Sequence, residues 1–319
     1  TSKRARAVPQ VQSDERTKVA ITGPQLKMTD IVLETAGKMD DVRKRQLALI
    51  EQLLELEVDD NRYAKLLFRK AELLHERARF YTFAVGGAED EAAALRAAGK
   101  ETEAQAVEAK IGDFRKEAKR SQRSAINVFH RIIKELPNYE RMPEVLHALG
   151  QAWWEVGFKE AALDTYTRII REFPDSSFVP DAWLSFGEYY FQNQELVKAL
   201  QAYQKAASFE GSLVRGFAEY KMAWTLYNLN DFDAAMKHFK TVITMSAAKG
   251  SDGRKRFDLG REARRDWVSA FSHGGKGEEA LSAIRSVAPK FEREMANRLA
   301  DIWLGDGKDR HATFLLDAL

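Results

Sequence analysis

The sequence predicts an all-α protein in which antiparallel helix pairs repeat along the chain. Helix-favouring Ala, Leu, Glu, Lys and Arg are abundant, and the 319 residues include only 7 prolines. Apolar side chains recur at three- and four-residue steps, which is the period of a helix with one buried face. The strongest segments also resemble one another at a spacing of 36 to 37 residues. A repeat of that length indicates stacked units that share one core.

The composition limits the classes of function. Hydrophobic residues make up 45% of the chain and charged residues 31%, which is enough apolar material for a buried core. Lys and Arg number 50 against 48 Asp and Glu, and the net charge of +2 argues against nucleic acid as the main partner. The chain has no cysteine. Disulfides, thiolate metal sites and cysteine nucleophiles are therefore excluded.

The first segment, residues 1–27, is expected to be an extended lead-in, because it shows no sustained period and contains Pro9, Gly23 and Pro24. The chain starts at Thr1 without a signal-peptide core, which indicates a processed or trimmed protein. No apolar run approaches the roughly 20 residues needed to span a bilayer. Membrane association is therefore expected to be indirect or through an anchor missing from this sequence.

Two further segments precede the clear repeats. Residues 28–62 are predicted to form N-terminal helices, since helical periodicity begins near Met28. Residues 63–142 are predicted to form one split repeat, in which a helix around Ala71 finds its partner only near Phe129.

The residues inserted into this split repeat have a different texture. Positions from about 85 to 123 are rich in Ala, Glu, Lys and Arg and carry few large apolar side chains. We expect a charged helical hairpin that projects from the body, or long extensions of two helices. Gly86-Gly87 is predicted to break the first helix, and Gly99 is predicted to form the turn.

Residues 143–245 contain three strong repeats. Their shared small residues are Gly150, Gly187 and Ala223, separated by 37 and 36 residues. Each small residue lies in a first helix, and each second helix carries an aromatic residue. These aromatic residues are Tyr166, Tyr203 and Phe239.

The second copy reads Trp183-x-x-Phe186-Gly187-x-x-Tyr190, followed by Ala199 and Tyr203. It resembles the tetratricopeptide repeat family, whose pattern is W-x2-L-G-x2-Y, then A-x3-F, then P. The resemblance implies a right-handed superhelical solenoid. It also implies that the small residue lets the two helices of a unit approach closely, while the aromatic residue of the second helix fills the gap to the next unit.

Residues 246–319 are expected to hold an insertion and two weaker repeats. One unit is predicted around Val268 and Ile284, and another around Trp303 and Leu316. Solenoid ends usually carry a polar capping helix. Because none follows Leu319, we expect the array to continue beyond the chain end. An alternative function is therefore the regulatory repeat region of a larger protein.

The linker Glu172–Trp183, which contains Pro174 and Pro180, points to one subgroup of this family. It is similar to the linkers of bacterial envelope members of the family, namely barrel-assembly lipoproteins, Tol–Pal coordinators and proteins of myxobacterial gliding machinery. This resemblance implies the periplasm or cell envelope, with the cytoplasm as the alternative.

A search for catalytic, cofactor and metal sites gives none. No two of the six histidines have the i, i+4 spacing of a helical zinc pair, and His75-Glu76 lacks the second histidine of H-E-x-x-H. Gly274-Gly275-Lys276-Gly277 lacks the spacing of a phosphate-binding loop and is expected to be a turn. We therefore expect no enzyme, no cofactor and no small-molecule substrate.

Binding of another protein is the expected function. The resemblance implies a concave groove lined by the first helix of each pair, where flat aromatic rings suit an extended peptide or an amphipathic helix. One recurring position reads Trp154, Phe191 and Tyr227. The alternative is that these rings pack between neighbouring helices. The predicted partner-binding residues are His147, Gln151, Trp154, Glu188, Phe191, Tyr220, Trp224 and Tyr227.

The same register also places Glu155, Asp181, Leu184, Ser185 and Gln192 on the concave face. The Lys and Asn residues with which some family members clamp the carboxylate tail of chaperones are replaced here. His147 and Gln151 occupy two of these positions in the first strong repeat. A chaperone adaptor is therefore not expected.

The sequence thus predicts a non-catalytic protein-interaction scaffold of a bacterial multiprotein complex. Whether the protein also forms a homo-oligomer is left undecided by the sequence. A rival function is a basic-patch binder of nucleic acid or an anionic membrane surface, whose binding would collapse with added salt. Its candidate residues are Arg254, Lys255, Arg256, Arg261, Arg264 and Arg265.

Overall fold

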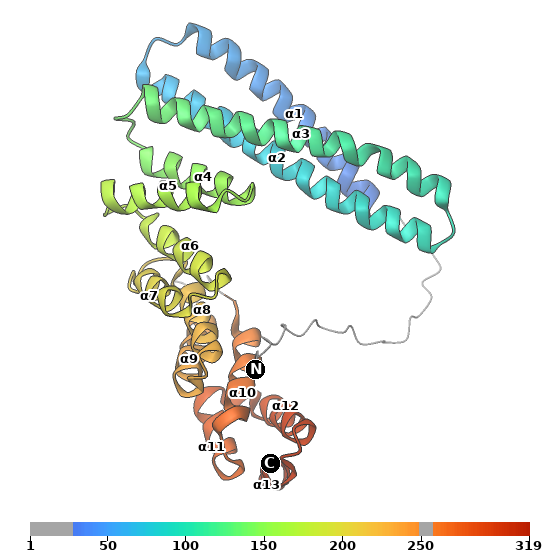
Figure 1. Ribbon diagram of the computed structural model, residues 1–319, viewed down its shortest axis with the longest axis vertical. Coiled ribbons are helices and arrows are strands. Elements are labelled where there is room, and N and C mark those ends of the chain that lie inside the picture. Colours follow the sequence, from blue (N-terminus) through green and yellow to red (C-terminus); the bar gives the residue numbers. More distant parts are fainter. Residues whose placement is uncertain (1–27, 249–257) are drawn as a thin grey trace, which may run out of the picture.

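The computed structural model describes residues 28–248 and 258–319, and every regular element in these two ranges is a helix (Figure 1). The predicted all-helical solenoid of antiparallel helix pairs is confirmed. None of the described helices is both long and apolar enough to cross a membrane. The first six helices are α1 (Met28–Leu56), α2 (Asp60–Ala97), α3 (Glu101–Glu135), α4 (Met142–Glu155), α5 (Lys159–Glu172) and α6 (Val179–Gln192). The others are α7 (Leu196–Ala207), α8 (Arg215–Asn228), α9 (Phe232–Ala247), α10 (Gly260–Gly274), α11 (Gly277–Val287), the 3-10 turn η1 (Pro289–Phe291), α12 (Glu292–Gly305) and α13 (Asp309–Asp317).

Helices adjacent in sequence pack side by side over most of the array. The pairs α2/α3, α4/α5, α6/α7 and α8/α9 each form a hairpin, and each hairpin contacts the next. Figure 1 shows the resulting row, with α1 to α3 at one end and α12 and α13 at the other. Each unit therefore buries its apolar face against its neighbours, as a solenoid requires.

A glycine notch fixes the first two repeat hairpins. A Cβ atom added to Gly150 would lie 2.5 Å from Cε1 of Tyr166, and one added to Gly187 would lie 2.3 Å from Cε1 of Tyr203. Real Cβ atoms essentially never come that close, so only glycine leaves room for each ring. The ring occupies the notch within its own hairpin, whereas the sequence assigned it to the gap before the next unit.

The turns inside the hairpins repeat a backbone feature. The second residue after the first helix has a positive φ, at Gly157 (86°), Gln194 (62°) and Asn230 (63°). This left-handed conformation reverses the chain within a few residues and satisfies the last carbonyls of the helix. Each short turn between paired helices α4/α5, α6/α7 and α8/α9 contains one of these residues.

The α2/α3 hairpin is formed by two helices without interruption. The predicted break at Gly86-Gly87 is wrong, because α2 continues through both glycines. Neither glycine has a neighbouring atom within 4 Å of an added Cβ. The turn at Ala98 and Gly99 (φ 74°) joins α2 to α3.

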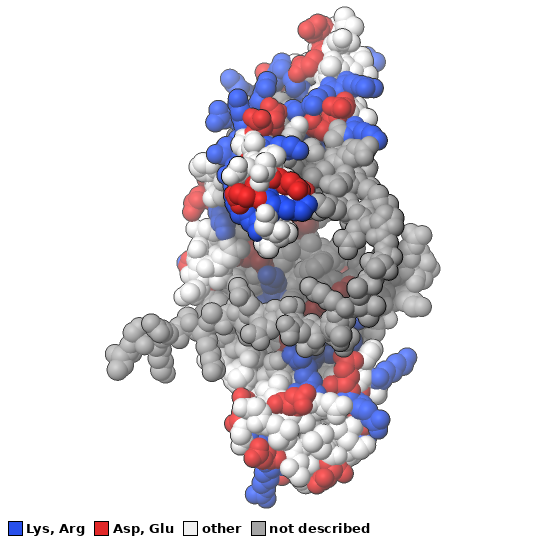
Figure 2. Space-filling model, turned by 90° about the vertical axis from the view of Figure 1, so that its right-hand side faces the viewer, with Lys and Arg blue, Asp and Glu red and all other residues white. Residues whose placement is uncertain are grey.

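Small buried residues line the outer half of this hairpin, where Ala84, Ala88 and Ala92 of α2 and Ala104 of α3 are all buried. Charged side chains of both signs are intermixed on the surface at this end of the molecule (Figure 2). One such pair joins the two helices, since Arg96 Nη1 lies 2.6 Å from Glu108 Oε1.

A buried carboxylate attaches α1 to α2. Asp40 accepts hydrogen bonds from Arg77 Nε (2.9 Å) and Tyr81 Oη (2.8 Å), and Lys44 Nζ lies 3.1 Å away. Burial alone would raise the pKa of Asp40, but the hydrogen bonds from Tyr81, Arg77 and Lys44 hold it below its usual value. Arg77 also pairs with Glu117 of α3 at 3.1 Å, so the three helices are joined.

The C-terminal helices depart from the hairpin pattern. α10 packs on α9 and α12, whereas α11 packs on α12 and α13. The two helices of the unit predicted around Val268 and Ile284 therefore both contact α12, while α9 lies against the first and α13 against the second. Trp303, fully buried in this region, donates from Nε1 to the carbonyl of Ser272 at 3.2 Å.

Candidate partner-binding groove

A groove lies between the first helices of the first two strong repeats. Its volume is about 350 Å³. Four predicted partner-binding residues line it, namely His147, Gln151, Trp154 and Glu188. The other lining residues are Arg79, Glu155, Tyr166, Asp181, Leu184, Ser185 and Gln192. Arg79 belongs to α2 and was missed in the sequence, because only the fold brings it beside α4.

The floor of the groove holds a histidine and a carboxylate. His147 stacks on Phe178 with ring centroids 4.6 Å apart, and its Nε2 lies 4.0 Å from Oδ1 of Asp181. Burial lowers the pKa of His147 to about 4, against the opposing charge of Glu144. Burial also raises the pKa of Asp181. At neutral pH the histidine is therefore neutral, and the floor presents one carboxylate next to an uncharged ring.

Glu188 lines the groove, but its oxygens are engaged. Tyr203 Oη donates to Oε1 at 2.7 Å, and Lys221 Nζ donates to Oε2 at 2.9 Å. These bonds connect α6 to α7 and to α8. Burial and this hydrogen bond raise the pKa of Tyr203. We infer that Glu188 mainly holds the wall of the groove in position.

Trp154 is the aromatic side chain at the open side of the groove. Its ring is half-buried, and Lys159 Nζ lies 4.9 Å from the ring centroid. A cation at this distance is attracted to the electron-rich face of the ring. The indole is thus held between the core and Lys159 of α5, with its remaining surface lining the groove.

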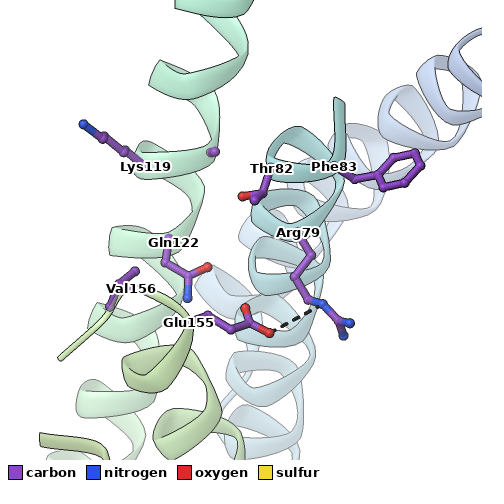
Figure 3. Close-up of a pocket in the computed structure, with 8 residues that line it drawn as sticks. Arg79, Thr82, Phe83, Lys119, Gln122, Glu155 and Val156 are labelled. Atoms are coloured by element: carbon purple, nitrogen blue, oxygen red, sulfur yellow. Dashed lines mark ion pairs between the residues drawn. The ribbon is translucent and has the colours of Figure 1, made fainter. Parts of the chain in front are cut away.

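The groove continues toward α2 and α3 as a second pocket of about 430 Å³ (Figure 3). Arg79 and Glu155 line both pockets, and Arg79 Nε lies 3.5 Å from Glu155 Oε1. Phe83 points outward from α2 and is largely exposed, while Gln122 donates to the carbonyl of Ala152 at 3.0 Å. The two pockets share Arg79 and Glu155 and form one surface, which runs from α2 and α3 past α4 to α6.

The predicted residues of the third repeat lie elsewhere. Tyr220 Oη and Trp224 Nε1 both donate to Oδ2 of the buried Asp266, at 2.6 and 3.2 Å. Tyr227 Oη lies 2.8 Å from His273 Nε2. Asp266 and His273 belong to α10, so α10 covers these rings. For this repeat the alternative holds, and the aromatic residues pack between helices.

Phe191 is also engaged in packing. It is partly buried against the cluster of Ala199, Tyr203 and Met222, and Lys221 Nζ lies 5.9 Å from its ring centroid. The predicted aromatic series along the groove is therefore divided. Trp154 lines the groove and also packs against the core of α2 to α6, whereas the rings that follow it contact later helices.

The predicted basic patch is not assembled as one free surface among the described residues. Arg254, Lys255 and Arg256 lie outside them. Arg264 stacks over the ring of Phe291 at 3.5 Å, and Arg265 Nε pairs with Asp266 at 3.3 Å. Arg261 is exposed on α10. Within residues 28–248 and 258–319, no group of His, Asp or Glu side chains has the arrangement of a metal site.

Comparison with known families identifies one segment. Residues 217–245, which span most of α8 and α9, match the family model described as tetratricopeptide repeat. This segment is similar to a tetratricopeptide repeat. With the helix pairs before it, the described chain is a tetratricopeptide-like helical repeat array, a kind of fold typical of protein-binding scaffolds. No curated protein matches the chain.

Solved structures give distant likenesses. The crystal structure of MamA is 19% identical over 58% of this chain and 92% of its own, with a TM-score of 0.40. The apo form of the quorum sensor NprR from B. thuringiensis is 15% identical over 90% of this chain and 92% of its own, with a TM-score of 0.38. TTC0263, a thermophilic tetratricopeptide protein of Thermus thermophilus, is 18% identical over 59% and 93%, with a TM-score of 0.32. Identities this low say nothing about ligands.

Proposed function

We propose that this protein is a non-catalytic scaffold that binds a peptide or helix of another protein in the concave groove. The observation that supports it is the difference between equivalent positions. Trp154 and His147 line an open groove, whereas the equivalent rings of Tyr227 and Tyr220 contact α10. Half-buried aromatic and polar groups that no neighbouring helix covers are typical of binding surfaces.

The chemistry of the groove favours one kind of segment. The indole of Trp154 and the side chain of Leu184 offer apolar contact. The carboxylate of Asp181 lies beside the neutral His147, with its pKa raised by burial, so a cation placed there would relieve the unfavourable desolvation of the charge. We propose a partner segment that carries an apolar anchor and a Lys or Arg about one helical turn away.

Site-specific photo-crosslinking tests this proposal. A photoreactive amino acid at Gln151, exposed in the groove, should capture a defined partner from native extract. The same amino acid at Gln201, exposed on the second helix α7, should not capture that partner. Trp154→Ala combined with Asp181→Asn should reduce the yield at least tenfold, while circular dichroism verifies an unchanged fold. Equal capture from both positions, or capture unaffected by the double change, would refute the groove as the binding surface.

We further propose that the partner complex belongs to a bacterial cell envelope, with the cytoplasm as the alternative. The support is the linker Glu172–Trp183, which resembles the linkers of envelope members of the family. Cell fractionation of the native source decides between these locations. Recovery with cytoplasmic markers alone would reject the envelope.

A further inference from the structure

The outer face of α1 carries an apolar stripe that no described helix covers. Its members are spaced by three, four or seven residues and are exposed by 41% to 78%. They are Met39, Val42, Leu49, Leu53 and Leu56. With the exposed Gln46 they occupy successive a and d positions of a heptad pattern, with Met39, Gln46 and Leu53 at a and Val42, Leu49 and Leu56 at d.

A different face of α1 packs against α2 and the core. Asp40 and Ile50 are buried toward α2, and Leu54 packs against the core shared by α2 to α6. The exposed stripe is offset from this buried row by one residue, which is roughly 100° around the helix. It therefore forms a separate face of α1. Monomeric proteins rarely expose a contiguous apolar stripe of this kind, so it indicates a covering partner.

The charges along α1 indicate how a partner helix would be oriented on this stripe. At the N-terminal part of the stripe, α1 carries Lys38, Arg43, Lys44 and Arg45 against Asp40 and Asp41, with which Lys44 pairs. At its C-terminal part the exposed charges of α1 are acidic, Glu51 and Glu55, and Glu51 also pairs with Lys70 of α2. The net charge along the stripe is therefore basic in its N-terminal part and acidic in its C-terminal part. Two copies of α1 in antiparallel orientation bring the basic part of each onto the acidic part of the other. A parallel pair would place like charges together.

We propose that α1 is a self-association helix through which two copies of this chain form an antiparallel pair. In this register Met39 packs on Leu56 of the second copy, Val42 on Leu53, and Gln46 on Leu49. The six layers span about 26 Å at 1.5 Å per residue.

The expected strength follows from the size of this contact. The exposed parts of the five apolar side chains amount to roughly 500 Å² per copy, which is at the upper end of the largest patch on a typical monomer. Two copies bury about 1,000 Å² in total, the lower limit of a specific interface. We therefore expect a dimer that dissociates in the micromolar range and whose concave groove stays accessible.

Sedimentation equilibrium of the full chain from about 1 to 200 μM tests the association. The wild type should move from monomer to dimer mass, and Leu49→Glu combined with Leu53→Glu should stay monomeric. Matched control changes are Val197→Glu and Leu213→Glu, since these side chains are as exposed but lie on the α7–α8 region. The controls should dimerise like the wild type. A wild type that is monomeric at 200 μM, or controls that abolish the dimer, would overturn the proposal.

The orientation is tested separately, and the absence of native cysteine makes the readout clear. An oxidised mixture of Val42→Cys and Leu53→Cys chains should give a disulfide-linked heterodimer. Each variant oxidised alone should give little linked product, because its cysteines lie in opposite halves of an antiparallel pair. Efficient linkage of Val42→Cys to itself would indicate a parallel pair and overturn the proposed arrangement.

Discussion

The α2/α3 hairpin and the repeat hairpins α4 to α9 are built from the same kind of helix but are held together differently. In α2 and α3, of 38 and 35 residues, the outer seam is mostly alanine, with Leu95 and Ile111. In the repeat hairpins, whose helices have 12 to 16 residues, buried aromatic rings fill the gap between the helices, and Tyr166 and Tyr203 lie against Gly150 and Gly187. A long helix pair is stabilised by many small van der Waals contacts along its length, whereas a short pair depends on a few large buried side chains.

The difference predicts where the molecule tolerates change. Tyr203 is fully buried and fills the notch at Gly187, so atoms added there have nowhere to go. Gly86 and Gly87 face open space in the middle of a long helix. The same substitution, glycine to alanine, should therefore have opposite signs in the two regions.

The largest effect is expected for Gly187→Ala and Gly150→Ala. Each new Cβ would overlap a buried tyrosine ring, and overpacking of this kind costs about 3 kcal/mol at the upper end of its range. The measurement is the urea midpoint of the whole chain, followed by circular dichroism. Tyr203→Leu added to Gly187→Ala should recover part of the loss by emptying the notch. A midpoint equal to the wild type for both single variants would show that the notch is not needed.

The second effect is a loss of stability in mild acid that originates in the repeats. The pKa of His147 is about 4 in the folded chain and about 6.5 when unfolded. Below pH 6.5 the unfolded chain therefore binds more protons, and stability falls as the pH drops toward 4, by roughly 2 kcal/mol at pH 4.5. The raised pKa of Asp181 acts in the opposite direction.

His147→Gln tests this assignment, because the glutamine side chain does not change its protonation state between pH 4 and 7. Urea midpoints at pH 7 and pH 4.5 should differ less for the variant than for the wild type. Asp181→Asn should instead enlarge the difference. If His147→Gln leaves the pH dependence unchanged, the acid sensitivity arises elsewhere.

A smaller effect of the opposite sign is expected in the long hairpin. Gly86→Ala or Gly87→Ala adds a methyl group to open space and restricts the unfolded chain. Each should gain about 0.5 to 1 kcal/mol. Thermal unfolding with and without the change gives the sign. A loss comparable to that of Gly187→Ala would contradict the distinction between the two regions.

The smallest effect is expected for Arg96→Ala. Both charges of its pair with Glu108 are well exposed to water, and such pairs contribute little to stability. The melting temperature of the variant should equal that of the wild type, both at low salt and with added salt. A clear drop at low salt alone would show that the outer hairpin depends on this ion pair.

The sequence predicted those parts of the fold that depend on local patterns. Gly150 and Gly187 recur 37 residues apart, and Gly157 and Asn230 occupy the same turn position in their own units. The period of these residues is therefore sufficient to locate the paired helices. The same register placed His147, Gln151 and Trp154 on one groove, because residues at equal positions of stacked units point the same way.

Contacts between distant segments were not predictable. Arg79 lines the groove from α2, two helices before α4 in the sequence. Asp266 contacts Tyr220 only because the fold brings α10 against α8. The break expected at Gly86 was wrong for a related reason. Buried Ala84 and Ala88 pack on the partner helix, and this packing outweighs the poor helix propensity of glycine.

The α2/α3 hairpin extends past the end of α4, whose last residues line one pocket with Phe83 and Lys119 (Figure 3). Beyond α4, α2 continues as Ala84–Ala97, a length of roughly 20 Å whose first part lies beside α1. Such an overhang acts as a cantilever, so a small tilt at its root becomes a large displacement at Gly99. A fluorophore attached at this tip, paired with one near α6, would report the bending of the array as a change in energy transfer.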